Sequence, residues 1–226
     1  RSSDGPTSPS DISRRTAISD SCSSSFVSRA ATVSRMLAAD AAEWRQLDGL
    51  CRVSISRFYR DQGVWRWLER DLLPRLVAQA AARGENRLRI WSAGCASGEE
   101  PYTLALMFAL GDTPGRGEPE ILATDADPLL LARARRACYP GSSLRELPVK
   151  RRAAFERSDD EFCLSPEYRS PVRFLVQDIR QDFPDGRFDL VLCRNLVFTY
   201  FQAPIQVVIA GRLAEVIVPG GLLLLG

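Results

Sequence analysis

After Gly84 the chain alternates short apolar runs with longer segments of helical periodicity, and this alternation constrains the fold more than any other feature. Apolar strands are expected at residues 88–92, 120–123, 172–176, 188–193 and 222–225, and helices at 99–110, 129–137 and 204–216. Repeated β-α units of this length favour a parallel sheet with helices on both faces. We therefore predict an α/β fold with a doubly wound, mostly parallel sheet in strand order 3-2-1-4-5.

The segment before Gly84 has a different composition. Residues 1–35 hold twelve Ser and few large apolar side chains, so burial cannot offset the entropy of ordering and we expect disorder. The next segment predicts a helical amino-terminal extension over residues 36–84, with one helix over 36–50 and another over 64–83. Pro74 falls inside the second helix and should kink it.

We expect residues 85–226 to form the main domain. Its last strand would be an exposed apolar edge, and such edges aggregate unless they are covered. We therefore expect the chain to be a fragment that lacks carboxyl-terminal strands, or a partner to cover this edge.

The absence of His excludes Ser-His-Asp triads, Cys-His dyads and His-based metal sites. The six Cys are scattered without a C-x-x-C pair, so we expect no metal site and reduced, mostly packed thiols in a cytoplasmic protein. A net charge of +2 gives no general argument for binding nucleic acid. No apolar run approaches the length of a membrane span, so we expect no membrane insertion.

The most informative motif is the turn at residues 91–102, with sequence WSAGCASGEEPY, between the first predicted strand and its helix. Ligands bind at the carboxyl ends of strands in such sheets, and glycines let them approach the backbone. The motif is neither G-x-G-x-x-G nor a P-loop, and its acidic helix start suits a ligand with an amino group and a sulfonium. The alternative is a plain turn in which Glu99 and Glu100 favour the first helical turn.

Polar residues also follow the next three strands. Asp125 could accept both ribose hydroxyls of a nucleoside, although Asp127 before a proline is an alternative helix cap. Asp178 could accept an adenine amino group or lie in a solvated turn, and Arg194 and Asn195 follow the fourth strand. Four polar clusters at one edge of one sheet predict a ligand site there.

Four motifs resemble, in the same order, those of the chemotaxis-receptor glutamate methyltransferases, the CheR family. They are FYRD at 58–61, the turn at 91–102, ATDAD at 123–127 and CRN at 193–195. The resemblance covers about residues 43–226 and implies a class I methyltransferase fold, which is Rossmann-like. It also implies S-adenosylmethionine as cofactor and S-adenosylhomocysteine as product.

The resemblance implies two catalytic residues, Arg60 near the reacting centre and Tyr200. Ala93 and Glu99 would hold the methionine end of the cofactor. The full set of implied cofactor-binding residues is Ser56, Ala93, Gly94, Glu99, Asp125 at the ribose, Asp178 and Ile179 by the adenine, and Arg194 and Asn195 lining the pocket. The sequence departs from the family pattern after CRN, where Tyr200 comes one residue later than usual.

The family also carries a small β-subdomain, which would fall within residues 140–175, with 161–164 pairing with 172–175. Basic side chains there and on the preceding helix could meet an acidic receptor surface or be solvated helix faces: Lys150, Arg151, Arg152, Arg133, Arg135 and Arg136.

The implied reaction is methylation of glutamate carboxylates on a protein such as a chemoreceptor, which is a helical bundle. A glutamate has a pKa of about 4.3 and needs no base at neutral pH, which suits a chain without His. Arg60 would orient the carboxylate. Two alternatives stay open: a methyltransferase of a small molecule or nucleic acid, and a degenerate module that binds the cofactor without catalysis.

Overall fold

The computed structural model describes residues 56–111 and 118–226. The chain divides into two units, Arg1–Ser54 and Ile55–Gly226, and the described residues belong to the second. The predicted disorder over 1–35 and the predicted helix over 36–50 therefore lie outside the described residues.

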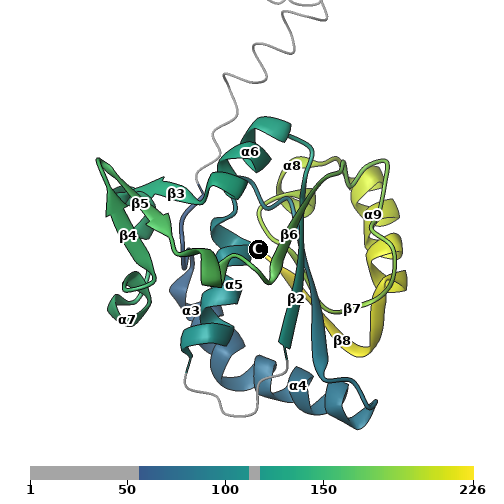
Figure 1. Ribbon diagram of the computed structural model, residues 1–226. Coiled ribbons are helices and arrows are strands. Elements are labelled where there is room, and N and C mark those ends of the chain that lie inside the picture. The colour runs from purple at the N-terminus through teal and green to yellow at the C-terminus, as the bar shows by residue number, and fades with distance from the viewer. Residues whose placement is uncertain (1–55, 112–117) are drawn as a thin grey trace, which may run out of the picture. The chain divides into compact units, whose positions relative to one another are not determined.

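Five strands form a parallel sheet in the order β6-β2-β1-β7-β8 (Figure 1). Their bounds are Arg87–Ala93 for β1, Glu118–Asp125 for β2, Val172–Val176 for β6, Phe188–Cys193 for β7 and Ile217–Leu225 for β8. This is the predicted order, and the α/β fold is confirmed. β8 is longer than predicted and lies at one edge of the sheet.

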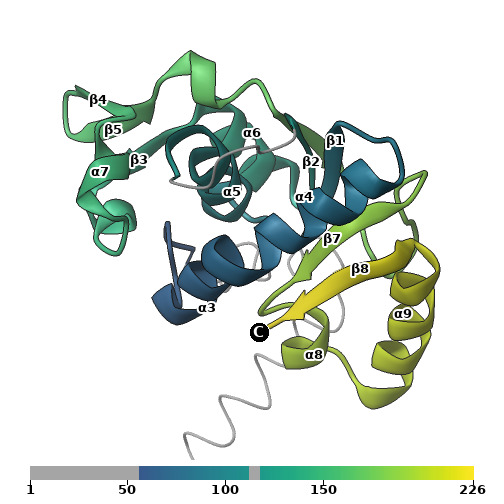
Figure 2. The same cartoon turned by 90° about the horizontal axis from the view of Figure 1, so that it is seen from below.

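Helices cover both faces of the large sheet (Figure 2). Their bounds are Leu73–Ala82 for α4, Glu99–Leu110 for α5, Pro128–Arg136 for α6, Val197–Tyr200 for α8 and Ala203–Glu215 for α9. Because side chains alternate along a strand, Leu88 and Ile90 of β1 pack in the core formed with α4 and α5. Trp91 and Ala93 pack in the core formed with α9. No helix in the described ranges is long and apolar enough to cross a membrane.

The predicted kinked helix is a continuous helical path of three parts. It comprises α3 at Gln62–Trp67, a π-helical turn at Leu68–Leu72, and α4. The N–H of Leu73 donates to the carbonyl of Leu68, so the hydrogen bonding changes immediately before Pro74, which has no N–H to donate. Gly84, with φ of 78°, ends the path as predicted.

A second sheet of three antiparallel strands has the order β3-β5-β4. Its strands are Cys138–Pro140, Phe155–Ser158 and Glu161–Leu164 for β3, β4 and β5, and α7 at Val149–Arg152 lies between β3 and β4 in the chain. This sheet lies within residues 138–164, close to the predicted range of the small β-subdomain, but the predicted pairing of 161–164 with 172–175 is wrong. β6 pairs with β2 instead, where Val172 and Phe174 pack against the core beside α6.

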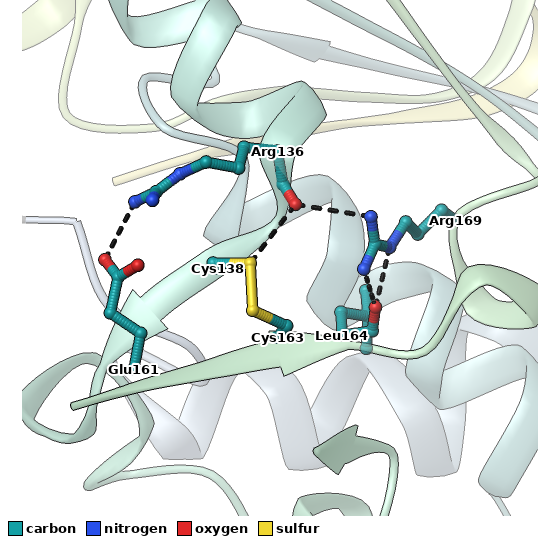
Figure 3. The surroundings of a disulfide bond; sticks show 6 residues. All are labelled: Arg136, Cys138, Glu161, Cys163, Leu164 and Arg169. Carbon is teal, nitrogen blue, oxygen red and sulfur yellow. Dashed lines mark hydrogen bonds and ion pairs between the residues drawn. A yellow bond between two sulfur atoms is a disulfide. The ribbon is translucent and has the colours of Figure 1, made fainter. Parts of the chain in front are cut away.

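A disulfide joins Cys138 of β3 to Cys163 of β5, which lie opposite each other in the antiparallel register (Figure 3). The expectation of reduced thiols is wrong for this pair, because the pairing of two strands brings together residues that are 25 positions apart. Cys95 and Cys193 are free and buried, as expected. Arg136, at the end of α6, also forms an ion pair with Glu161 of β5 at 2.8 Å.

Candidate active site

The predicted polar clusters lie at one edge of the five-stranded sheet. Parallel pairing aligns the ends of β1, β2, β6 and β7, and α6 and α8, which follow β2 and β7, begin on the same side of the sheet (Figure 1). Asp125 ends β2 opposite Val176, the last residue of β6. The edge therefore brings together the turn after β1 and the residues that follow the other strands.

The turn between β1 and α5 is tied closely to β2. The N–H groups of Gly94 and Cys95 donate to the carbonyl of Thr124 at 2.8 and 2.9 Å. Gly94 has φ of 76°, and a Cβ there would lie 2.5 Å from Cδ2 of Leu196. The turn requires Gly94 both for its backbone conformation and for its closeness to the residues after β7.

Glu99 at the start of α5 is a buried carboxylate with only 2% of its surface exposed. Its Oε1 accepts from the Ser97 hydroxyl at 3.3 Å, whereas Oε2 has no hydrogen-bond partner among the described residues. Burial raises the pKa of Glu99, and the hydroxyls of Ser56 and Ser97 partly oppose that rise. A buried carboxylate oxygen without a partner fits a cationic group such as an ammonium.

Asp125 connects two turns at this edge. Its Oδ2 accepts from the N–H of Ala96 at 2.9 Å, and its Oδ1 accepts from the N–H of Asp127 at 2.9 Å. Asp127 caps α6 through the N–H of Leu129, as the alternative interpretation of this segment predicted. A carboxylate oxygen can accept more than one hydrogen bond, so these contacts are compatible with binding a ribose.

After β6, Asp178 is paired with Arg180, a partner that sequence reasoning missed. Nη2 of Arg180 lies 2.5 Å from Oδ2 of Asp178, and the guanidinium stacks 5.8 Å from the ring of Phe201. Ile179 is buried in the core that contains Trp91. The Asp178 carboxylate and the buried Ile179 are thus consecutive residues after β6, the segment that was predicted to contact the adenine.

Arg60 lies in a strained loop. The residues on either side of it, Tyr59 and Asp61, have φ of 60° and 64°, a region that residues other than glycine rarely adopt. The N–H of Tyr59 donates to Oγ1 of Thr103 at 3.3 Å, and Nε1 of Trp65 donates to the carbonyl of Arg60 at 2.6 Å. Such strain persists only where the surroundings hold it, and it is concentrated at functional sites.

Arg194 lies between this loop and α5. Its side chain is 4% exposed, and its Nη2 donates to Oδ2 of Asp61 at 2.6 Å and to the carbonyl of Arg60 at 3.3 Å. Its Nη1 lies 3.4 Å from Oε2 of Glu100, and its guanidinium stacks 5.2 Å from the ring of Trp65. The next residue, Asn195, has φ of 50°.

Tyr200 is placed differently from the other predicted residues. It ends α8 with 71% of its surface exposed, whereas Glu99 and Arg194 are buried. The structure therefore does not bring Tyr200 into the buried cluster around Arg60.

A second buried arginine supports the Arg60 loop and was missed by sequence reasoning. Arg151 of α7 is 6% exposed, so the interpretation of its basic run as a solvated face is wrong for this residue. Its Nη1 donates to the hydroxyl of Tyr59 at 2.8 Å, and Nη2 forms an ion pair with Glu69. Burial raises the pKa of Tyr59 to about 12. Because α7 has four residues, no helical periodicity could have indicated which side chain is buried.

Residues 54–226, more than half of the chain, match the family described as CheR methyltransferase, SAM binding domain. The chain belongs to the CheR methyltransferase family. The chemotaxis protein methyltransferase of Listeria innocua is 38% identical over 78% of this chain and 65% of its own length. That of Listeria monocytogenes is 37% identical, over 83% of this chain and 69% of its own. The probable chemotaxis protein methyltransferase of Rhizobium etli is 32% identical, over 83% and 72%.

The chain thus spans about two thirds of the length of these relatives. Among solved structures, the N-methyltransferase NodS from Bradyrhizobium japonicum matches with a TM-score of 0.42 and 16% identity, over 77% of this chain and 64% of that one. The strand order β6-β2-β1-β7-β8 shows the α/β fold directly.

The matched part of the CheR chain is a domain that binds S-adenosylmethionine. The residues present fit this cofactor: Glu99 offers a buried carboxylate oxygen to an ammonium, and Asp125 offers a carboxylate at the end of β2. Glu99 begins α5 after β1 and Asp125 ends β2, and because β1 pairs with β2, both groups follow neighbouring strands.

Proposed function

We propose that this CheR protein transfers a methyl group from S-adenosylmethionine to a glutamate carboxylate on a protein, and that the acceptor is a helical bundle such as a chemoreceptor. The observation that carries the proposal is Arg60, held in a strained loop beside the cofactor edge of a chain without His. Membership of the CheR family and relatives named chemotaxis protein methyltransferases support the acceptor class.

The chain's own residues would bind and orient the reactants. The bound cofactor supplies an electrophilic methyl group on a sulfonium. Glu99 would hold its ammonium, with Ser56, Ala93 and Gly94 around the same turn, and Asp125 would hold the ribose. Asp178 and Ile179 would contact the adenine, and Arg194 and Asn195 would line the pocket just before Leu196, whose side chain lies against Gly94.

Arg60 would orient the acceptor carboxylate through charge-assisted hydrogen bonds. The acceptor oxygen forms a bond to the methyl carbon while the carbon–sulfur bond breaks, and sulfur keeps the electron pair of that bond. No proton is removed, because a glutamate with a pKa of about 4.3 is already ionised. The main requirement is the positioning of oxygen and methyl group in line. Tyr200, with its exposed ring, would contact the acceptor protein.

We also propose a cytoplasmic location, which the scattered cysteines without a C-x-x-C pair favour. The Cys138–Cys163 disulfide is evidence against a cytoplasmic location, because disulfides persist mainly in oxidising compartments. Rapid thiol trapping in intact cells measures the state of this pair, and a fully reduced pair would agree with the cytoplasm.

The chemistry of the product tests the proposed reaction. Incubation of the chain and labelled S-adenosylmethionine with a lysate should label protein, and mild alkali should release that label as volatile methanol. Carboxylate esters hydrolyse under these conditions, whereas N-methyl products do not. Label that withstands alkali would contradict the glutamate reaction and favour a different acceptor.

Arg60→Ala should lower turnover by about 100-fold or more, the scale of a misplaced reactive group, while the affinity for S-adenosylhomocysteine changes by less than about threefold. Arg70→Ala is the matched control, because Arg70 lies on the same helical path in an exposed pair with Asp71. A large loss of cofactor affinity in Arg60→Ala with normal turnover of bound cofactor would assign Arg60 to cofactor binding.

A further inference from the structure

The guanidinium of Arg194 is a buried charge whose Nη1 and Nη2 contact protein groups, while its Nε has no hydrogen-bond partner among the described residues. Burying a charge is costly unless ion pairs and hydrogen bonds compensate for lost water. Arg194 has such compensation on two sides: Asp61 and the carbonyl of Arg60 on one, and Glu100 on the other. The ring of Trp65 covers its face. The side chain therefore links the strand end after β7 to two other elements.

On the α5 side, Arg194 contacts Glu100, a carboxylate whose side chain is 15% exposed. Oε1 of Glu100 accepts from the Ser92 hydroxyl at 2.8 Å, and Oε2 faces Arg194 at 3.4 Å. Burial raises the pKa of Glu100, while Arg194 and Ser92 oppose that rise. Ser92 lies on β1 and Glu100 lies on α5, so these contacts attach the Arg194 guanidinium to the large sheet and its helix.

On the other side, Asp61 uses its carboxylate in an unusual way. Asp61 is the N-cap of α3, a position where Asp normally accepts a hydrogen bond from the first helical turn, but here its side chain makes no such bond. Its Oδ2 instead binds Nη2 of Arg194 at 2.6 Å. The left-handed conformations of Tyr59 and Asp61 thus coincide with a contact that pulls the loop toward β7.

We infer that Arg194 is a positioning residue that holds the main chain of Arg60 at the cofactor edge through Asp61 and the Arg60 carbonyl. The inference rests on the proposed role of Arg60 at the acceptor, and it assigns to the Arg194 side chain a role different from cofactor contact. A displacement of about 1 Å in a reacting group can cost on the order of 100-fold in rate. Fixing the loop from a rigid strand end would prevent such a displacement.

Asp61→Ala tests this role without leaving Glu100 unpaired, since Arg194 and Glu100 stay in place. We expect turnover to fall by about tenfold or more, with affinity for S-adenosylhomocysteine within about twofold of wild type. In an Arg60→Ala background, Asp61→Ala should cause no further loss, because Asp61 acts through Arg60. Arg194→Lys, which keeps the charge but loses the forked contacts, should behave like Asp61→Ala.

Asp71→Ala is the matched control. Asp71 on the same helical path is 41% exposed, against 55% for Asp61, but its partner Arg70 is exposed whereas Arg194 is buried, so none of these quantities should change. An equal loss from Asp61→Ala in the presence and absence of Arg60 would overturn the inference. So would a loss of cofactor affinity in Arg194→Lys that matches its loss of turnover.

Hydrogen exchange of the full chain without substrates separates this inference from the proposed reaction. Asp61→Ala should speed amide exchange in residues 58–65 while the exchange of α5 stays unchanged. Faster exchange together with no methyl ester in the wild type would reject the glutamate reaction and keep the loop contact. Unchanged exchange would reject the role of Arg194, whatever the reaction proves to be.

Discussion

The five-stranded sheet buries charged side chains at its carboxyl edge, whereas the three-stranded sheet is closed by aromatic side chains and a disulfide. Glu99 and Arg194 are almost fully buried at that edge and Glu100 is mostly buried, and burial raises the pKa of both acids. In the small sheet region, Phe58 meets the rings of Tyr139 and Phe155 edge-on, at 4.9 and 5.1 Å. Buried charge lowers the free energy of unfolding and buried aromatic surface raises it, so the two regions have opposite effects on stability.

The two regions are also in contact. The hydroxyl of Tyr139 in β3 donates to the carbonyl of Ser97 in the cofactor turn at 2.8 Å. Phe58 immediately precedes the Arg60 loop, and its N–H donates to the carbonyl of Ser143 at 3.0 Å. The small sheet therefore supports both the cofactor turn and the Arg60 loop. We therefore expect changes in the small sheet to alter mainly stability, and changes at the carboxyl edge of the large sheet to alter mainly cofactor binding.

The largest expected effect is that of Phe58→Ala. Phe58 is fully buried, and its removal leaves a cavity between Tyr139 and Phe155. We expect the free energy of unfolding to fall by about 3–5 kcal/mol, measured by urea denaturation. Phe198→Ala, a partly buried ring in the other core, should cost less. A loss below about 1 kcal/mol for Phe58→Ala would show that the aromatic cluster beside the small sheet does not stabilise the protein.

The disulfide should have the next largest effect. Opening a loop of 25 residues should lower the free energy of unfolding by about 3 kcal/mol in the chain-entropy account. The measurement is thermal unfolding with and without dithiothreitol. The double variant Cys138→Ser and Cys163→Ser should match the reduced protein and should not respond to reductant. An unchanged melting temperature on reduction would show that packing alone holds β3 against β5.

Glu99→Gln should have the smallest effect on stability, in the opposite direction. Burial raises the folded-state pKa of Glu99 above its usual value. The folded state therefore gains stability from the neutral carboxyl at low pH and loses it as pH rises through that pKa. Gln stays neutral, so the variant should be more stable by about 1 kcal/mol at neutral pH. The corresponding rise in melting temperature is about 2–4 °C, and it should vanish in acid.

The same variant should bind S-adenosylhomocysteine more weakly, because the proposed partner of the cofactor ammonium is lost. Calorimetric titration at neutral pH measures this loss, and Glu85→Gln, at an exposed acid, provides the control. A variant that is more stable and binds normally would remove Glu99 from the cofactor site and would leave its burial without a function.

The order of the large sheet could be predicted from sequence because each β-α unit carries its own local pattern. The predicted bounds of α5, β6 and β7 agree with the structure, and the polar residues after four strands do lie at one edge. The roles of Arg60, Tyr200 and the cofactor-binding residues stay predictions. The parallel topology brings the polar residues after these strands to one edge, and that topology is indicated by the alternation of strand-like and helix-like apolar patterns along the chain.

Only the tertiary structure decided which side chains meet. The Cys138–Cys163 bond spans 25 positions, the contact of Tyr59 with Arg151 spans 92, and that of Asp61 with Arg194 spans 133. Hydrophobic periodicity shows which face of an element is buried, but it does not show which charged groups meet in the core. Local sequence does not distinguish a buried arginine from a solvated one, because the groups that replace water around the buried guanidinium are distant in the chain.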